Sequence, residues 1–421
     1  MIDQLRAALA LFDLPGDIVG RAVEACETAA PSWAVREANA VQLAARTVKV
    51  FSEAGITDAH LQGTVGYGYH DFGREAYEAI LAQLVDSEAA LARVQLVSGT
   101  QAIVASIAAL AGAEGTICSL TGKPYDTLRL ALTDHPRALR PRGEGYVEVA
   151  WAPGRALDEG AAAAALSAKP AVAFIQRSRG YAPRPSASIE EIARLVALCK
   201  RHSPSTAVIV DNCYGEFVEP REPGAVGADV VVGSLIKNPG GGMATTGAYV
   251  AGTREAIERI AEYVFAPGLG SRIGPSLEAV RSMYAGLHRA PRTVAESLKT
   301  MDFAAALFAR LGYDVDPKCG DDRTDIIQAI RLGSRDKLER FAHGLQRMLP
   351  VNPRARPEPG PVPGYADPVI MAGGAFITGS TIELSCDAPL REPFEVYLQG
   401  GMDLVHGIIA VTSAAAAVGV A

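Results

Sequence analysis

Short, uninterrupted apolar runs that alternate with helical patterns constrain the fold of this chain most strongly. They are rich in Val and Ile, and the amphipathic segment 188–202 separates two of them. The expected strands cover 116–119, 171–176, 207–211, 229–233 and 247–251. Strands that are apolar on both faces and joined by helices form a parallel sheet with helices on both sides. The pattern therefore predicts an α/β domain with a mostly parallel sheet.

The segments on either side of these runs follow other patterns. Apolar spacing predicts helices at 5–12, 17–30 and 32–55, and again over 74–95. Beyond residue 290 we expect a long helix ending at Gly312, strands at 325–332 and 381–385, and a helix at 336–349. The expected division is an N-terminal helical segment at 1–65, a large domain at 66–290 and a smaller α+β domain at 291–421.

Composition excludes several classes of partner. The formal net charge is −7, which argues against nucleic acid, because phosphate backbones are bound by clustered Lys and Arg. The longest uncharged stretches, 95–113 and 407–421, are too polar or too short to span a membrane. The start of the chain lacks a signal-peptide pattern. The six cysteines show no C-x-x-C spacing, so we expect reduced thiols, no metal site and a cytoplasmic location.

The common nucleotide and hydrolase motifs are absent from the sequence. There is no G-x-x-x-x-G-K-[ST], no H-E-x-x-H and no G-x-S-x-G. The stretch GLGSRIG at 268–274 misses G-x-G-x-x-G by one position and does not open an early strand-to-helix turn. A nicotinamide-binding domain is therefore disfavoured.

Three sequence features are each weak evidence for a binding site, but together they indicate the same kind of site. Asp211 ends an apolar strand, Lys237 follows the next apolar strand, and a Ser-Gly-Thr turn at 98–100 opens an apolar helix. Each has an ordinary structural interpretation, as a turn carboxylate, a loop lysine and a helix cap. In an α/β sheet, however, ligands bind beyond the carboxyl ends of the strands.

This set of residues is the one needed to hold pyridoxal 5′-phosphate. The phosphate would bind at the helix N-terminus, Lys237 would bond covalently to the cofactor, and Asp211 would keep the pyridine nitrogen protonated. Tyr125, which lies in the sequence between the turn at 98–100 and Asp211, supplies an aromatic side chain. The spacing of 26 residues from Asp211 to Lys237 suits one βα connection between neighbouring strands.

Several long motifs make the chain resemble a known family. They are GYGYHDFGREAYE, RVQLVSGTQAI, FIQRSRGYAPRPS, VIVDNCYGEFVE, GSLIKNPGGGMATTGAYVAG and GAFITGSTIELSCDAPLREPFEVYLQGG, spanning residues 66–401. The chain is similar to the aspartate-aminotransferase-like (fold type I) enzymes that use pyridoxal phosphate. Within their Cys/Met-metabolism group it resembles the methionine gamma-lyase family, also labelled "aluminum resistance protein".

The resemblance implies a set of site residues. Lys237 would hold the cofactor and act as base, and Asp211 would pair with the pyridine nitrogen. Phosphate binding falls to Ser98, Gly99, Thr100 and Ser234, and ring stacking to Tyr125, which with Tyr67 could also protonate the leaving group. Tyr67, Tyr69 and Arg74 would reach the partner subunit's phosphate, and Arg391, with Arg179 second, would bind the substrate carboxylate.

The implied function is a lyase that cleaves a carbon–sulfur bond of an amino acid and releases a thiol, a 2-oxo acid and ammonia. The implied assembly is a homodimer or homotetramer with shared active sites. Ile236, Gln101 and His70 depart from the residues usual in related enzymes and leave the substrate open. Three alternative functions also stay open. They are another reaction on the same cofactor (transamination, replacement, racemisation or aldol cleavage), a non-catalytic cofactor-binding protein, and a nicotinamide-dependent enzyme.

Overall fold

The computed structural model describes residues 2–151 and 158–421 and divides into two compact units. One unit is Ala44–His288; the other joins the residues up to Leu43 with Arg289–Ala421. The division falls within two long helices, α2 (Gly16–Ala54) and α9 (Val280–Arg310). The described residues up to Leu43 thus pack with the C-terminal residues rather than forming the separate segment 1–65 expected from the sequence, because apolar side chains from Leu5 to Trp33 share one core with that unit.

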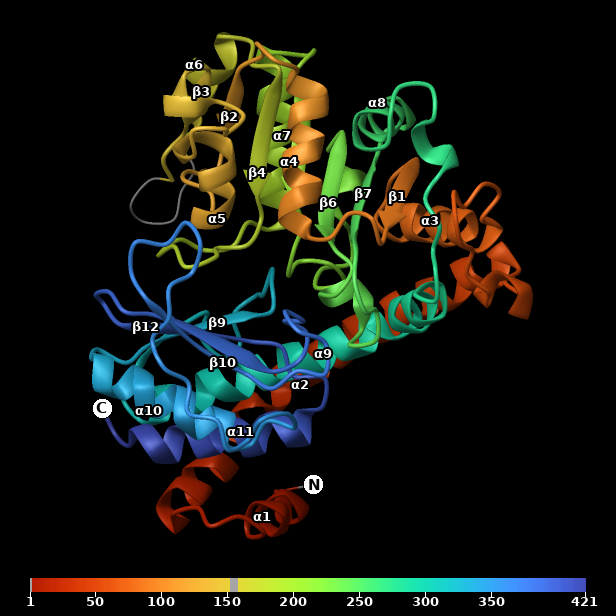
Figure 1. Cartoon of the computed structure of the whole chain (residues 1–421). Helices are drawn as coiled ribbons and strands as arrows, with labels where there is room; N and C mark the ends of the chain where they lie inside the picture. The colour runs from red at the N-terminus through yellow and green to blue at the C-terminus, as the bar shows by residue number, and fades with distance from the viewer. Residues whose placement is uncertain (1, 152–157) are drawn as a thin grey trace. The chain divides into compact units, whose positions relative to one another are not determined.

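The unit Ala44–His288 is built on a seven-stranded sheet in the order β1-β7-β6-β5-β4-β2-β3. From β6 to β3 all neighbouring strands are parallel, and β7 is antiparallel to both β6 and β1 (Figure 1). The strands are β1 (Ala89–Arg93), β2 (Ile117–Ser119), β3 (Tyr146–Glu148), β4 (Val172–Gln176), β5 (Ala207–Asp211), β6 (Val230–Ser234) and β7 (Ala248–Gly252). This confirms the predicted mostly parallel sheet.

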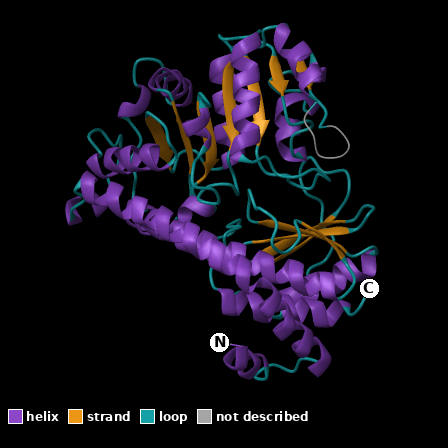
Figure 2. Ribbon diagram, turned by 180° about the vertical axis from the view of Figure 1, so that it is seen from behind, coloured by secondary structure: helices purple, strands orange, loops and turns teal. Residues whose placement is uncertain are grey.

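Helices α4 and α8 cover one face of this sheet, where their apolar residues join those of the strands in a single core (Figure 1). Alternate strand residues such as Phe174, Ile209 and Val232 point into this core, as the two-residue period of a strand requires. Figure 2 shows the sheet from the reverse side. The helices of the unit are α3 (Phe72–Leu84), α4 (Gly99–Ala111), α5 (Asp126–Arg129), α6 (Glu159–Ser167), α7 (Ile189–His202) and α8 (Arg254–Val264).

Three local predictions were wrong. The expected helix 74–95 ends at Leu84, and Ala89–Arg93 forms strand β1 after a turn in which Asp86 has φ +56°. The connection from β5 to β6 contains only a 3₁₀ turn, Pro223–Val226, rather than an α-helix. The expected helices 17–30 and 32–55 form the single helix α2, which contains Pro31. The carbonyl that loses its donor to Pro31 belongs to Glu27, which is exposed and can be hydrated.

The second unit contains a five-stranded antiparallel sheet in the order β10-β11-β12-β9-β8. Its core also takes in α1 and the first part of α2. A fourth local prediction was also wrong: the strand expected at 381–385 is shifted along the chain, and β11 starts only at Ser385. The elements are α1 (Ile2–Leu9), β8 (Asp314–Asp316), β9 (Ile327–Arg331), α10 (Arg335–Gln346), β10 (Val369–Gly373), β11 (Ser385–Pro389), β12 (Glu395–Gln399) and α11 (Leu404–Val418). No helix of the described residues is long and apolar enough to cross a membrane.

A buried ion pair lies inside this second unit. The Asp302 carboxylate accepts a hydrogen bond from Arg323 Nε at 2.6 Å, and both side chains are fully buried. Arg36 Nε donates to the other carboxylate oxygen at 3.1 Å. The core tolerates these charges because the Asp302 carboxylate and the Arg323 guanidinium neutralise each other. Removal of Asp302 would leave Arg323 as a buried charge without its partner.

We predict that Asp302→Ala lowers the free energy of unfolding by about 3–5 kcal/mol, since Arg323 would keep a buried charge without a counterion. Urea unfolding of the purified variant measures this. Glu339→Ala is the matched control, because the exposed Arg335–Glu339 pair should contribute about 0–1 kcal/mol. Equal losses in the two variants would contradict the prediction.

Candidate active site

The ends of two neighbouring strands meet the start of a helix in the unit Ala44–His288. Asp211 is the last residue of β5, Ser234 is the last of β6, and α4 begins at Gly99. A Cβ placed on Gly99 would lie 3.4 Å from Cys213 Sγ and 3.5 Å from the Ser234 Cβ, so the helix start touches both strand ends. The three features singled out in the sequence are therefore brought together at one edge of the sheet.

The N-terminus of α4 has the form of an anion cradle. Ser98 caps the helix by accepting a hydrogen bond from the Gln101 N–H at 3.1 Å. The Ser98 carbonyl accepts from the Ala102 N–H at 3.1 Å. The first N–H groups of a helix have no acceptor within it, so those of Gly99 and Thr100 are the ones available to a phosphate. The Ser234 hydroxyl lies beside the same helix start and can add a donor.

Lys237 occupies the turn that follows β6. Its backbone N–H donates to the Ser234 carbonyl at 3.3 Å, and the 3₁₀ turn Asn238–Gly240 comes next. The side chain is half-buried, and its Nζ lies 3.9 Å from the ring centroid of Tyr214. Burial lowers the pKa of Lys237, but Tyr214, Cys213 and Asp211 outweigh this effect and hold the pKa above its ordinary value. Without a bound cofactor the amine is therefore an ammonium ion.

The Asp211 side chain is buried, with 4 % of its surface exposed. One carboxylate oxygen accepts a hydrogen bond from the Cys213 N–H at 3.1 Å. Burial raises the pKa of Asp211, while Lys237 opposes the rise. A buried carboxylate in this situation gains from a second cationic partner. A protonated pyridine nitrogen would be such a partner.

The turn after β5 is strained and firmly held. Tyr214 has φ +74° and Phe217 has φ +60°, a left-handed conformation that costs about 1–3 kcal/mol at each non-glycine residue. The fully buried Arg177 donates to the Asn212 side-chain oxygen at 2.6 Å and to the carbonyl of Gly215 at 3.0 Å. These contacts fix the conformation that directs Tyr214 toward Lys237.

Tyr125 stands next to the cradle, at the start of α5. Its hydroxyl lies 2.8 Å from Thr100 Oγ1, and its backbone N–H donates to Gln176 Oε1 at 2.9 Å. Burial raises the pKa of Tyr125 well above 10, with a further contribution from Asp211, so the phenol keeps its proton. Anchored at both its backbone and its hydroxyl, the side chain can present a fixed aromatic surface and a proton.

The residues present fit pyridoxal phosphate. A helix N-terminus that begins with a glycine suits the phosphate, and Ser234 lies next to this glycine. A buried carboxylate and a lysine follow neighbouring parallel strands, and a fixed tyrosine adjoins the helix start. Among the described residues no group of His, Cys, Asp and Glu could hold a metal ion.

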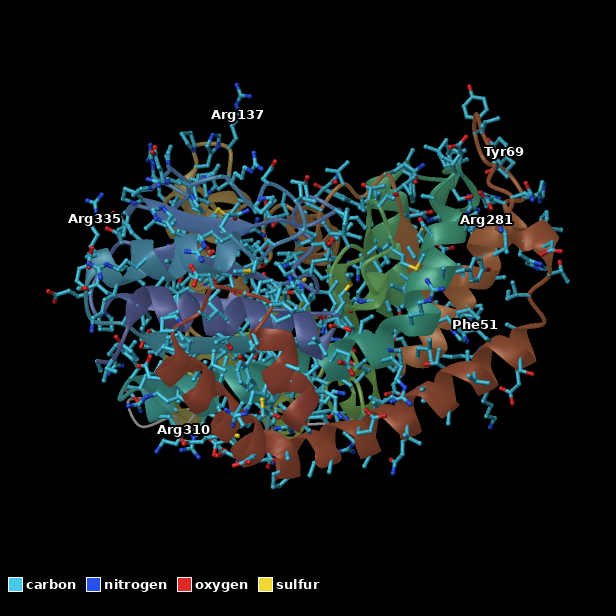
Figure 3. The ribbon with its side chains drawn as sticks, turned by 90° about the horizontal axis from the view of Figure 1, so that it is seen from below. Phe51, Tyr69, Arg137, Arg281, Arg310 and Arg335 are labelled. Carbon is cyan, nitrogen blue, oxygen red and sulfur yellow. The ribbon has the colours of Figure 1, made fainter. Side chains whose placement is uncertain are left out.

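Tyr67 and Tyr69 lie on the loop before α3 and are exposed, with 76 % and 51 % of their surface accessible. Their ring centroids are 5.9 Å apart, and Figure 3 shows Tyr69 projecting outward from the loop. Arg74 is placed differently from the sequence expectation. Its guanidinium is buried and donates to the Gly68 carbonyl at 3.0 Å and to the Gly274 carbonyl. Arg74 therefore holds the loop from beneath instead of extending outward.

The two arginines expected to bind substrate lie in different units. Arg179 belongs to the segment after β4, is 5 % exposed, and its Nε donates to the Ala182 carbonyl at 3.4 Å. Arg391 lies between β11 and β12 in the second unit, with Nη1 at 3.8 Å from an Asp367 carboxylate oxygen. Its side chain is 40 % exposed, so it is accessible to a ligand within its own unit.

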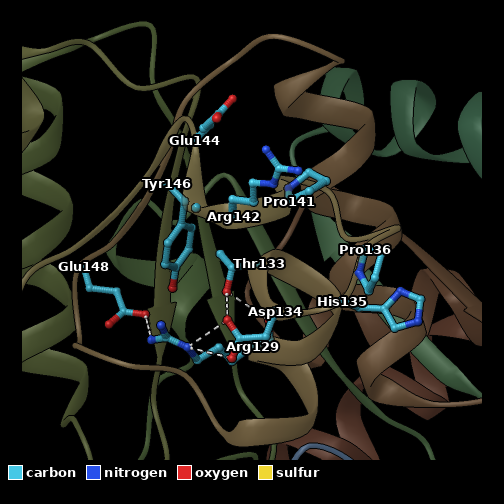
Figure 4. Close-up of a pocket in the computed structure, with 11 residues that line it drawn as sticks. Arg129, Thr133, Asp134, His135, Pro136, Pro141, Arg142, Glu144, Tyr146 and Glu148 are labelled. Carbon is cyan, nitrogen blue, oxygen red and sulfur yellow. Dashed lines mark hydrogen bonds and ion pairs between the residues drawn. The ribbon is translucent and has the colours of Figure 1, made fainter.

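A large open hollow lies elsewhere on the first unit (Figure 4). Its volume is about 1030 Å³, and it is lined by the chain that follows α5 and by the edge strand β3. Arg129, one of the lining residues, is paired with Glu148 at 2.5 Å and with Asp134 at 3.1 Å. Neither Lys237 nor Asp211 lines this hollow, so its size does not identify it as the reaction site.

The fold and the site define a fold type I enzyme that uses pyridoxal phosphate, and comparisons with known proteins identify the family. The family model described as methionine gamma-lyase matches residues 21–419. The protein YnbB of Bacillus subtilis (strain 168) is 41 % identical over 373 residues, which cover 88 % of this chain and 89 % of that protein. The chain belongs to the methionine gamma-lyase family, as predicted from its motifs.

Solved structures agree with this assignment. A carbon-sulfur lyase involved in aluminum resistance from Clostridium novyi NT has a TM-score of 0.90 and 34 % identity, with 97 % of each chain covered. At 16 % identity, the pyridoxal-5′-phosphate-dependent protein YhfS from Escherichia coli has a TM-score of 0.59 over 90 % of this chain and 94 % of its own, and shows the shared fold. The predictions of fold class, of a lyase-type enzyme and of the cofactor are confirmed.

The sequence reasoning missed a second layer of site residues: Arg177, Tyr214, Glu216 and Asn238. Glu216 is fully buried, accepts a hydrogen bond from the Tyr249 hydroxyl at 3.0 Å, and faces no counterion at salt-bridge distance among the described residues. The Asn238 side-chain amide donates to the backbone carbonyl of Glu216 at 2.9 Å. All four residues lie in motifs that identified the family, but the run DNCYGEF, which starts at the last residue of β5, gives no indication of its conformation.

The burial of Glu216 predicts how the stability of the protein depends on pH. Burial, with a contribution from Glu222, raises the pKa of Glu216 to about 8, whereas in the unfolded chain it lies near 4.5. Between these values the folded protein binds one proton more than the unfolded chain, so stability falls as the pH rises through this window. Glu216→Gln, which cannot ionise, should remove up to about 1.4 kcal/mol per pH unit of that fall.

The measurement is urea unfolding of wild type and Glu216→Gln between pH 5 and 8.5. Glu258→Gln, at an exposed position, is the control and should keep the wild-type slope. If the Glu216→Gln protein lost stability with pH as steeply as wild type, Glu216 would not be the protonated group.

Proposed function

We propose that this protein is a carbon–sulfur lyase that acts on a sulfur-containing amino acid at the site formed by Lys237 and Asp211. The observation that carries the proposal is that these two residues follow neighbouring parallel strands at the edge where α4 begins. Family membership supports the reaction class. The reaction consumes water and yields a thiol, a 2-oxo acid and ammonia, with no external oxidant, reductant or acceptor.

The cofactor, when bound, supplies the electron sink that makes the substrate α-proton acidic. Asp211 keeps a proton on the ring nitrogen, because its buried carboxylate is stabilised by a positive partner. The N–H groups of Gly99 and Thr100, together with Ser98 and Ser234, hold the phosphate. The Lys237 amine, when it is free and neutral, would take up the α-proton of the substrate.

The leaving thiolate needs a proton. Tyr125 keeps its own proton because its pKa is raised, and its hydroxyl is held beside Thr100. We therefore assign leaving-group protonation to Tyr125, or to Tyr67 of a neighbouring subunit. Arg391 is our first choice for the substrate carboxylate, since a guanidinium binds a carboxylate in two places. Arg179 is the second choice, because its guanidinium is buried and its Nε already donates to a carbonyl.

We further propose a homodimer or homotetramer in the cytoplasm whose active sites are shared between subunits. The two exposed rings of Tyr67 and Tyr69, on a loop fixed by Arg74, support this assembly. Large aromatic side chains exposed on a held loop are typical of contact residues. A shared site would make the subunit pair the smallest active unit.

The cofactor lysine is tested by absorbance and reduction. We expect the purified protein with pyridoxal phosphate to absorb visible light, and borohydride to abolish this band and leave a pyridoxyl group on the Lys237 peptide in mass spectrometry. Lys237→Ala should show neither and lose about 10²–10⁴-fold of the lyase rate, measured as 2-oxo acid and ammonia from thioether amino acids. Lys49→Ala, at an exposed position, is the control. Full activity in Lys237→Ala, or a requirement for a 2-oxo acid acceptor, would contradict the proposal.

The shared site is tested by mixing two inactive variants. Lys237→Ala and Tyr67→Ala are co-expressed with different tags, and the hybrid is purified on both tags in turn. With shared sites, each hybrid pair contains one site with both residues intact, so about half of the wild-type activity per pair should return. With separate sites every site lacks one residue, and the hybrid would stay as inactive as its parents.

A further inference from the structure

The ring of Tyr214 is placed against the amine that the reaction depends on. Lys237 Nζ lies 3.9 Å from the centre of this ring, well inside the distance of about 6 Å at which a cation is attracted to an aromatic face. Both side chains are half-buried, so water screens the contact less than at the surface. A phenol ring in contact with an ammonium group stabilises the charged form of the amine.

The backbone under this ring is unusual. Tyr214 has φ +74°, a conformation that bulky residues rarely adopt, and Phe217 three residues on has φ +60°. Glu222 holds the far end of the turn, where its carboxylate accepts from the Phe217 N–H at 2.7 Å and from the Asn212 side-chain amide at 2.8 Å. Strain of this kind persists where the surrounding structure enforces it, and it is concentrated at functional sites.

We propose that Tyr214 is a positioning residue for the cofactor lysine, and that its ring holds the free Lys237 amine in the protonated state at one place beside Asp211. The inference rests on the proposed function, in which Lys237 bonds to the cofactor. The ring then sets how readily the resting amine becomes neutral, which is the form that can bond to the cofactor.

Other groups also act on Lys237. Asp211 and Cys213 lie on the same strand end and turn as Tyr214, and both favour the charged amine. Glu216, from the same turn, and Tyr125, from the start of α5, also interact with it. The Tyr214 hydroxyl also hydrogen-bonds Lys237 and favours the charged amine. All of the groups other than Tyr214 itself would remain in a variant changed only at position 214. The ring's contribution can therefore be measured against an unchanged background.

Two substitutions separate the ring from the backbone. Tyr214→Phe keeps the aromatic face and removes the hydroxyl. Tyr214→Asn removes the ring, and Asn tolerates a left-handed φ better than other residues, so the turn keeps its conformation. Tyr263→Asn, at a position 58 % exposed on α8, controls for the loss of a tyrosine elsewhere.

The readout is the amine itself, in protein freed of cofactor. Each variant is treated with trace acetic anhydride at a series of pH values, and acetylation of the Lys237 peptide is measured by mass spectrometry relative to the exposed Lys49. Only the neutral amine reacts, so the midpoint of the curve reports the pKa, while access to the site changes only the plateau. We expect Tyr214→Asn to lower the midpoint by about one pH unit, a tenfold change in the neutral fraction. Tyr214→Phe loses the hydroxyl that hydrogen-bonds Lys237 but keeps the aromatic face, so it should lower the midpoint by less than Tyr214→Asn does. Tyr263→Asn should match wild type.

An unchanged midpoint in Tyr214→Asn would overturn the proposal. A shift in Tyr214→Phe as large as that in Tyr214→Asn would also overturn it, because the hydroxyl and not the ring would then hold the amine. Circular dichroism of each variant verifies that it is folded. Failure of borohydride to attach the cofactor to Lys237 would refute the proposed function alone, because acetylation is measured without cofactor.

Discussion

The parallel arrangement of β4, β5 and β6 is the constraint on which the site depends. Because these strands run in the same direction, their carboxyl ends lie at one edge, with Gln176 and Asp211 in register. Helix α4 starts at that edge, where a Cβ built on Gly99 would be in van der Waals contact with Cys213 and Ser234. Strand direction thus determines which residues meet, and the start of α4 directs its helix dipole toward them.

Much of this arrangement could be predicted from the sequence. The apolar runs that became β4 to β7 have a composition that fits only a strand covered on both faces, and long motifs identified the family. Asp211, Lys237 and Gly99 stood out because they follow or precede such runs directly. Local pattern failed at β1, where AALAR lacks β-branched residues and its strand conformation depends on pairing with the distant β7.

The second layer of the site could not have been predicted in the same way. Arg177, Glu216 and Glu222 are charged residues, which are normally exposed, and nothing in their sequence neighbourhood indicates that they are buried. Their positions follow from contacts made after the chain has folded, such as the Arg177 hydrogen bonds across the turn that follows β5. Tyr214 belongs to the same group, because its orientation comes from a backbone conformation that a sequence pattern does not encode.

The Arg74 contacts with Gly68 and Gly274 have a consequence for assembly. Asp71 reinforces them, since its carboxylate accepts from the N–H of Ser276 at 2.9 Å and from the Arg74 N–H at 2.9 Å. These contacts fix the backbone of the loop that carries Tyr67 and Tyr69 before any other molecule arrives. Binding to such a loop does not have to order a flexible segment, so less conformational entropy is lost on association. In the proposed assembly, recognition at this loop would therefore be closer to the docking of two rigid surfaces than to folding upon binding.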